Sequence, residues 1–206
     1  MSGYDGDRIA ALEGIEPELA MRLAWASDVW IFAYGSLMWD PGFAFCEAAP
    51  AMVRGYHRRF CVYSHGYRGT PNRPGLVLGL DRGGACKGIA YRVPAVDLPA
   101  AMSYLWDREM KSGVYRLKEF SVAIPGGEAS AVAFVVARSH PRYAPGLTEL
   151  QTARLIRQGI GQRGSSLQYL ENTTRELERL GVVDGALLRL ERRVKSMTEV
   201  AFKNAA

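Results

Sequence analysis

The sequence has 206 residues, of which 48% are hydrophobic and 23% are charged, a composition that excludes a disordered chain. No apolar run reaches the roughly 18 residues that a membrane-spanning helix requires, and residues 1–26 lack the basic-then-apolar order of a signal peptide. The net charge of +5 comes from scattered basic residues without a nucleic-acid-binding motif, which favours small anionic ligands over nucleic acid. We therefore expect a cytoplasmic protein that binds neither nucleic acid nor membrane.

The chain is expected to combine strands and helices in an α+β fold. The segments expected to form strands carry β-branched and aromatic runs bounded by turn residues: 29–34, 58–63 within the segment 51–63, 76–80, 86–93, 115–124 and 129–136. The segments expected to form helices repeat apolar residues at helical spacing: 9–26, 94–110, 148–158, 165–180 and 185–195. Turns at 81–84 and 125–127 are expected to close two hairpins, and residues 64–75 a long loop. Many short strands around one amphipathic helix predict a closed or strongly curved sheet.

The most distinctive segment is the end of the first apolar strand, where Tyr34-Gly35-Ser36-Leu37 follows an uninterrupted hydrophobic run. Gly35 lets the backbone adopt a positive φ or lets a ligand approach the main chain closely. Consecutive amides in such a turn can hold an anion or stabilise an oxyanion. The turn is therefore a candidate floor for a small-molecule site.

A glutamate falls on the apolar side of the helix expected over residues 94–110. The stripe that faces the core consists of Leu98, Ala101, Met102, Leu105 and Trp106. At about 100° per residue, Glu109 lies near the middle of this stripe, whereas Arg108 falls on another face. A buried carboxylate is costly unless it is paired or used, and burial raises its pKa toward neutrality, where it can take and return a proton. Two alternatives stay open: the helix ends before Glu109, or Glu109 pairs with an arginine.

Other catalytic classes have less support. Ser36 lacks the Gly-x-Ser-x-Gly context of a nucleophile elbow, and no glycine-rich nucleotide-binding motif is present. The three cysteines and three histidines show neither disulfide nor metal-ligand spacing, and only His65, in the long loop, is a candidate general base.

A series of short motifs follows in order along residues 29–180. After Tyr34-Gly35-Ser36-Leu37 come Arg54-Gly55-Tyr56-His57-Arg58-Arg59-Phe60, Arg68-Gly69-Thr70-Pro71, Gly88-Ile89-Ala90-Tyr91, Asp107-Arg108-Glu109-Met110, Pro141-Arg142-Tyr143 and Gly161-Gln162-Arg163-Gly164. In this order they resemble the markers of the ChaC-type γ-glutamylcyclotransferases. The resemblance implies that family's fold, a small mixed β-barrel with flanking helices. Together with the helical spacing at both ends of the chain, it predicts an N-terminal helical arm (1–27), a catalytic domain (28–182) and a C-terminal helical tail (183–206).

The resemblance also implies an activity: cleavage of glutathione into 5-oxoproline and cysteinylglycine, without a metal or organic cofactor. Glu109 takes the place of the family's catalytic glutamate. The γ-glutamyl-binding role falls to Tyr34, Gly35, Ser36, Leu37, Met38 and Trp39, and Arg68 and Tyr143 are further candidates for substrate contacts. Arg68 is equally compatible with a solvated loop cation.

Two further functions remain open at this point. One is cyclotransferase activity on a different γ-glutamyl amine or dipeptide. The other is a non-catalytic, regulatory role related to cation transport. The basic amphipathic segment 187–195 could touch a membrane surface, but it is more typical of a solvated helix face.

Overall fold

The apolar run before the Tyr34 turn forms a buried strand, as predicted. In the computed structural model, which describes residues 27–203, β1 spans Asp28–Ala33 and its last three residues are all buried. β1 pairs antiparallel with one end of β3, from Asp28 opposite Pro94 to Ala33 opposite Ile89. It also pairs in parallel with β5. The consecutive residues Ile31, Phe32 and Ala33 are all buried, so side chains on both faces of the strand are covered, which explains why the sequence there is continuously apolar.

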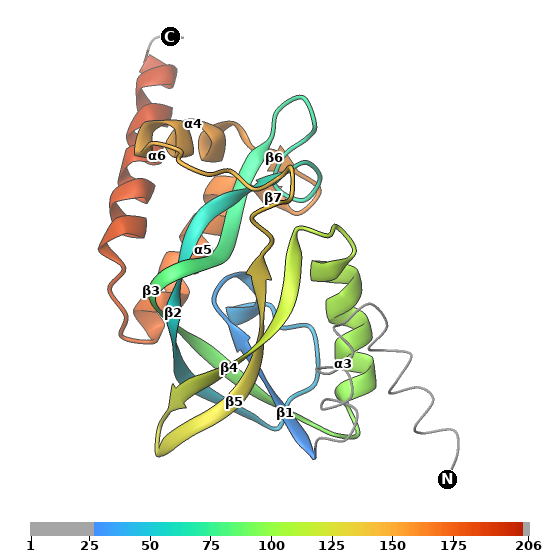
Figure 1. Ribbon diagram of the computed structural model, residues 1–206. Helices are drawn as coiled ribbons and strands as arrows, with labels where there is room; N and C mark the ends of the chain where they lie inside the picture. Colours follow the sequence, from blue (N-terminus) through green and yellow to red (C-terminus); the bar gives the residue numbers. More distant parts are fainter. Residues whose placement is uncertain (1–26, 204–206) are drawn as a thin grey trace. The chain divides into compact units, whose positions relative to one another are not determined.

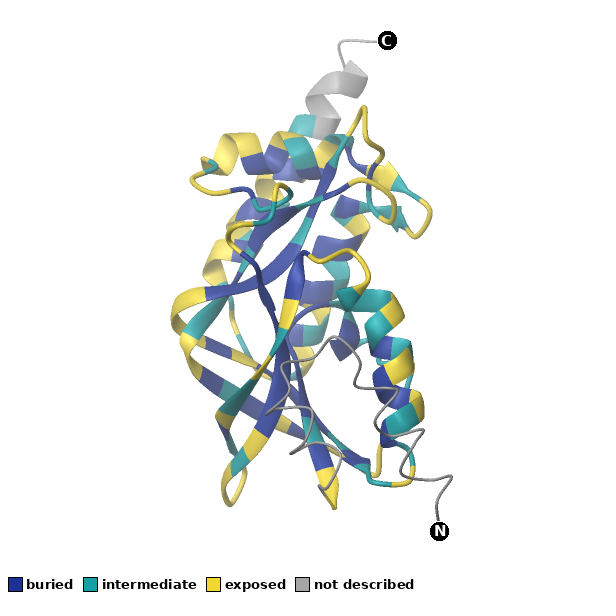
Figure 2. Ribbon diagram, turned by 45° about the vertical axis from the view of Figure 1, so that its right-hand side comes forward, coloured by how far each residue is buried: buried dark blue, intermediate teal, exposed yellow. Residues whose placement is uncertain are grey.

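The strands close into a five-stranded mixed barrel in the order β1-β3-β2-β4-β5 (Figure 1). β2 spans Glu47–Ser64, β4 spans Tyr115–Ile124 and β5 spans Gly127–Val136. The predicted β4–β5 hairpin is confirmed, with paired residues from Tyr115 opposite Val136 to Ile124 opposite Gly127. The turn that joins these two strands is exposed, whereas the second half of β5, Ala131–Val136, is buried (Figure 2). The predicted α+β fold with a small mixed barrel is therefore confirmed.

The hairpin predicted at residues 81–84 is wrong, because β3 is one strand that spans Gly75–Pro94. Gly83 and Gly84 have φ angles of 102° and 70°, so the chain bends there without leaving the sheet. The two ends of β3 have different partners: Leu80 pairs with β5, and residues 89–94 pair with β1. A bent strand shared between two partners is how a small barrel closes.

The described residues divide into two compact units, which we treat separately. The first contains residues 27–57 and Leu80–Ala137, and the second contains Arg58–Gly79 and residues 138–203. Two of the three boundaries fall inside long strands, β2 and β3, and the third follows Ala137, just after β5. Each unit is therefore built from two separate stretches of the chain.

In the first unit, the predicted helix over 94–110 is present but changes character along its length. The α-helix α3 spans Leu98–Leu105 and buries Leu98, Ala101, Met102 and Leu105, as the apolar stripe predicted. Trp106, the fifth residue of that stripe, is only half-buried. A π-helical turn, η2, then covers Trp106–Met110 and is closed by a hydrogen bond from the Lys111 amide to the Trp106 carbonyl. The wider turn changes the direction of every side chain after Trp106.

The second unit contains the three C-terminal helices that the apolar spacing predicted. They are α4 (Glu149–Gln158), α5 (Ser166–Arg179) and α6 (Gly185–Lys203), and they pack against one another. A two-stranded hairpin of β6 (Ile160–Gly161) and β7 (Gly164–Ser165) connects α4 to α5. No helix in the described part of the chain is long and apolar enough to cross a membrane. The predicted helix over 9–26 lies outside the described residues.

Candidate active site

The segment after β1 forms a single tight turn, η1, which spans Ser36–Met38. The Met38 amide donates to the Gly35 carbonyl at 2.9 Å, and the Asp40 amide donates to the Ser36 carbonyl at 3.0 Å. Gly35 has φ −138°, so the positive φ that we considered for it does not occur. The first amides of a helical turn, here those of Ser36 and Leu37, have no acceptor inside the turn.

Two tyrosines fasten this turn to the barrel. The Tyr34 hydroxyl donates to the Phe134 carbonyl of β5 at 2.8 Å, and the Tyr91 hydroxyl of β3 donates to the Met38 carbonyl at 3.0 Å. The side chains of Leu37 and Met38 are buried in the core. Three predicted binding residues, Tyr34, Leu37 and Met38, thus have side chains turned into the protein.

Glu109 lies in the π-helical turn, and its side chain is only 16% exposed. The alternative in which the helix ends before Glu109 and leaves it in solvent is wrong. The other alternative, pairing with an arginine, is observed, because the Arg108 Nε lies 3.2 Å from the Glu109 Oε1. Burial and an adjacent cation act on a carboxylate in opposite directions. The raised proton affinity expected from burial alone therefore stays a prediction.

Arg108 is the residue of this site that the sequence analysis missed. Its side chain is 5% exposed, although helical periodicity placed it away from the core. Nη2 donates to the Ser36 Oγ at 2.9 Å, and Nη1 donates to the Asp40 carbonyl at 2.7 Å and to the Tyr104 hydroxyl at 2.6 Å. One guanidinium group thereby connects the glutamate to the turn. The sequence signal was its position immediately before Glu109.

The electrostatics of this cluster favour a permanently charged arginine. Burial desolvates the Arg108 guanidinium and by itself would lower its pKa, but the charge of Glu109, the Tyr104 hydroxyl and Asp40 together hold that pKa above its ordinary value. The Asp40 Oδ2 lies 3.4 Å from the Arg108 Nη1. Two carboxylates therefore flank one buried cation.

Close packing between Gly42 and Tyr104 also holds this cluster together. Gly42 has φ +72°, and a Cβ atom there would lie 2.1 Å from the Tyr104 hydroxyl oxygen. The absence of a side chain lets the Tyr104 ring reach the turn and accept the hydrogen bond from Arg108. Residues 34–42 and the end of the α3–η2 helix thus form one connected group of contacts in the first unit.

The remaining predicted contacts, Arg68 and Tyr143, belong to the second unit. The Arg68 guanidinium lies 5.5 Å from the centre of the Tyr169 ring and is 3.4 Å from both the Ser165 carbonyl and the Gln168 Oε1. Tyr143 forms a bridge with Val62 of β2, and the Arg59 guanidinium lies 5.8 Å from its ring centre. Arg68 is therefore not simply a solvated loop cation. A substrate role for either residue stays a prediction.

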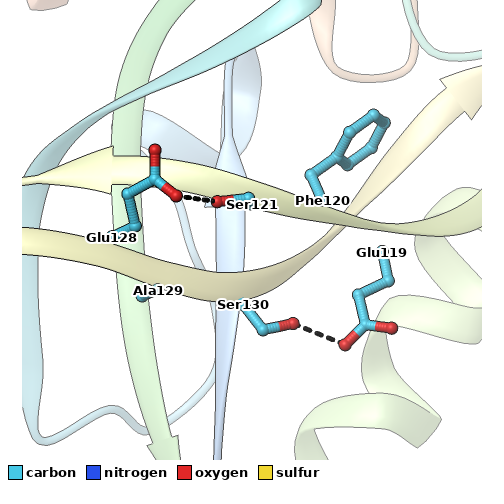
Figure 3. A pocket seen from close by; sticks show the side chains of 6 residues that line it. All are labelled: Glu119, Phe120, Ser121, Glu128, Ala129 and Ser130. Atoms are coloured by element: carbon cyan, nitrogen blue, oxygen red, sulfur yellow. Dashed lines mark hydrogen bonds between the residues drawn. The ribbon is translucent and has the colours of Figure 1, made fainter.

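A separate hollow of about 400 Å³ lies on β4 and β5 of the first unit (Figure 3). It is lined by two serine–glutamate hydrogen bonds, from Ser121 to Glu128 and from Ser130 to Glu119, and by the Phe120 ring. Its acidic lining does not suit an anionic ligand, and it contains none of the predicted site residues. In the described residues no three His, Cys, Asp or Glu side chains gather closely enough to hold a metal ion.

Comparison with known proteins assigns the chain to a family. A family model described as ChaC-like protein matches residues 29–197. This range contains the barrel, the turn after β1 and Glu109. The chain therefore belongs to the ChaC-like protein family.

The relatives that resemble the chain carry consistent names. The chain is 37% identical over 188 residues to the glutathione-specific γ-glutamylcyclotransferase of Escherichia coli K12. The aligned region covers 89% of this chain and 81% of that protein. It is 37% identical over 147 residues to the mouse glutathione-specific γ-glutamylcyclotransferase 1, covering 69% of this chain and 66% of the mouse protein. The crystal structure of the yeast γ-glutamyl cyclotransferase specific to glutathione superposes with a TM-score of 0.75 at 21% identity, over 83% of this chain and 97% of the yeast chain. At that identity the likeness establishes the fold.

Proposed function

We propose that the protein is a γ-glutamylcyclotransferase that cleaves glutathione into 5-oxoproline and cysteinylglycine. The observation that carries the proposal is the connection of a largely buried carboxylate, Glu109, to the turn after β1 through the Arg108 side chain. Family membership and the names of the bacterial and mouse relatives support it. The substrate is a small anion, which agrees with the net positive charge of the chain.

In the proposed reaction the α-amino nitrogen of the substrate attacks its own γ-carbonyl carbon, and the bond from that carbon to the cysteine nitrogen breaks. The attacking nitrogen loses two protons between ammonium and lactam, and the departing nitrogen gains two between amide and ammonium. A carboxyl group that alternates between its ionised and protonated forms can carry each proton in turn. We assign this role to Glu109. Because the attack is intramolecular, no nucleophile from the protein is needed.

The turn after β1 has the complementary role of holding the γ-glutamyl group in the folded shape required for ring closure. We propose that the backbone amides of Gly35, Ser36 and Leu37 hold a substrate carboxylate or the oxyanion of the tetrahedral intermediate. We propose that Trp39, the residue that follows this turn, also contacts the γ-glutamyl group.

We place the reaction in the cytoplasm. The three cysteines all lie in the described part of the chain and form no disulfide, which agrees with a reducing compartment. We propose that the reaction needs no cofactor, because the substrate supplies its own nucleophile and the protein supplies the base.

The test is to incubate the purified protein with glutathione and to quantify 5-oxoproline and cysteinylglycine by mass spectrometry. Glu109→Gln removes the proton carrier and should lower kcat by about 10²-fold or more. Glu178→Gln changes an exposed glutamate on α5 and serves as the matched control. Unchanged turnover in Glu109→Gln would exclude the assigned mechanism.

The same assay decides between the proposed substrate and its alternatives. A panel of γ-glutamyl amino acids and γ-glutamyl amines should show slower turnover than glutathione. Faster turnover of another γ-glutamyl compound would identify that compound as the substrate. Binding of glutathione, seen as a rise in Tm, without product from any substrate would favour a regulatory protein.

A further inference from the structure

We infer that Arg108 is a positioning residue for the proposed reaction: its guanidinium group holds the Glu109 carboxylate and the substrate-binding turn in one fixed arrangement. This inference rests on the proposed function. It adds a role for a residue that does not itself exchange a proton with the substrate.

All three nitrogen atoms of the Arg108 guanidinium are engaged. Nε faces the Glu109 Oε1 at 3.2 Å, Nη2 donates to the Ser36 Oγ at 2.9 Å, and Nη1 donates to the Asp40 carbonyl at 2.7 Å. These partners come from two stretches of chain that are about seventy residues apart in sequence. A planar guanidinium fork can satisfy such divergent acceptors together, whereas a single ammonium group cannot.

The π-helical turn explains how neighbouring residues serve the same site. A π turn takes more residues per revolution than an α turn, so consecutive side chains diverge less in direction. Arg108 reaches the turn after β1 through Ser36 and Asp40, and Glu109 beside it contacts the same guanidinium group. π turns inside α-helices are frequent at functional sites.

Burial makes the arrangement rigid. With its side chain 5% exposed, Arg108 has little access to water, so exchanging any of its protein partners would leave a buried polar group unsatisfied. Glu109 can then rotate only by giving up the Nε contact. A displacement of a catalytic group by about 1 Å can cost on the order of 10²-fold in rate. A fixed carboxylate beside a fixed turn is what an intramolecular ring closure requires.

The experiment compares Arg108→Lys and Arg108→Ala with the native enzyme in steady-state kinetics on glutathione, under conditions in which circular dichroism shows each variant fully folded. Arg116→Lys and Arg116→Ala, at an exposed position of β4 in the same unit, are the matched controls. We expect Arg108→Lys to keep the charge but to lower kcat by 10- to 100-fold. We expect KM to change less than kcat, because the turn still holds the substrate.

Chemical rescue separates positioning from a general effect on stability. Millimolar methylguanidinium should raise the kcat of Arg108→Ala at least tenfold, whereas methylammonium at the same concentration should not. If Arg108→Ala does not fold, Arg108→Lys carries the test alone. A folded Arg108→Lys enzyme with kcat within threefold of the native value would overturn the inference, and so would equal rescue by both cations. Failure of the native enzyme to form 5-oxoproline would instead refute the proposed function, so the two failures are distinguishable.

Discussion

The buried hydroxyl of Tyr34 offers a direct test of how the turn after β1 works. The sequence assigned Tyr34 to substrate binding, but its hydroxyl donates to the Phe134 carbonyl at 2.8 Å and the residue is 8% exposed. Tyr34→Phe removes that hydrogen bond while keeping the ring. The loss of one buried neutral hydrogen bond should lower the free energy of unfolding by about 1–1.5 kcal/mol. For a chain of this size, that corresponds to a fall in Tm of roughly 3–5 °C.

The two possible roles of the hydroxyl differ in what they do to kinetics. If it only anchors the turn, kcat/KM should stay within about threefold of the native value. If it donates to a charged group of the substrate, its removal should cost about 1.5–3 kcal/mol of binding, or roughly 10- to 150-fold in KM. Urea unfolding and glutathione kinetics on the same preparation measure both quantities. Tyr67→Phe, at a residue 43% exposed, is the control. A tenfold rise in KM with unchanged stability would refute the anchoring role.

Two predictions concern the second unit. The hydroxyl of the fully buried Ser166 accepts from the Leu76 amide at 3.1 Å and donates to the Arg68 carbonyl at 3.0 Å. Ser166→Ala should therefore lower the free energy of unfolding, measured by urea titration, by about 2–4 kcal/mol. A loss below about 1 kcal/mol would contradict this account. Burial would raise the pKa of Glu191, but hydrogen bonds from Lys195 and a neighbouring threonine outweigh it and hold that pKa below its ordinary value. Its stabilising effect is therefore present near neutral pH and is lost as the pH falls through the lowered pKa. In Glu191→Gln, the free energy of unfolding should therefore fall less steeply at acid pH than in the native protein. An unchanged pH dependence would exclude the contact between Glu191 and Lys195 as its source.

Sequence patterns predicted the secondary structure correctly where a segment's own residues determine it. The β4–β5 hairpin follows from two β-rich runs separated by Pro125-Gly126-Gly127, and the helix α3 follows from its apolar stripe. The two consecutive glycines at 83–84 are compatible with a hairpin and with a bend inside one strand. Only the partners of β3 on either side decide between them, and these partners come from distant parts of the chain.

The same limit applies to the site. Glu109 could be found from its place near the apolar stripe, and the turn after β1 from its abrupt change in polarity. Arg108 could not, because its burial depends on a π turn and on acceptors supplied by Ser36 and Asp40. Periodicity at about 100° per residue describes only the α-helical part of that helix. The side-chain directions of Tyr34 and Met38 likewise depend on β3 and β5.

The two units are interleaved along the chain, and this affects how the protein can be made and altered. The first unit has all of its residues once the ribosome has passed Ala137, but the second begins at Arg58 and needs the C-terminal helices as well. Cutting between His57 and Arg58, or between Gly79 and Leu80, would break a continuous strand instead of a linker. Neither unit can therefore be obtained by simple truncation. A frameshift or early stop anywhere after the barrel would remove the C-terminal part of the second unit. The ends of β2 and β3 that belong to that unit would then lack the residues they pack against, and such a state is prone to aggregation.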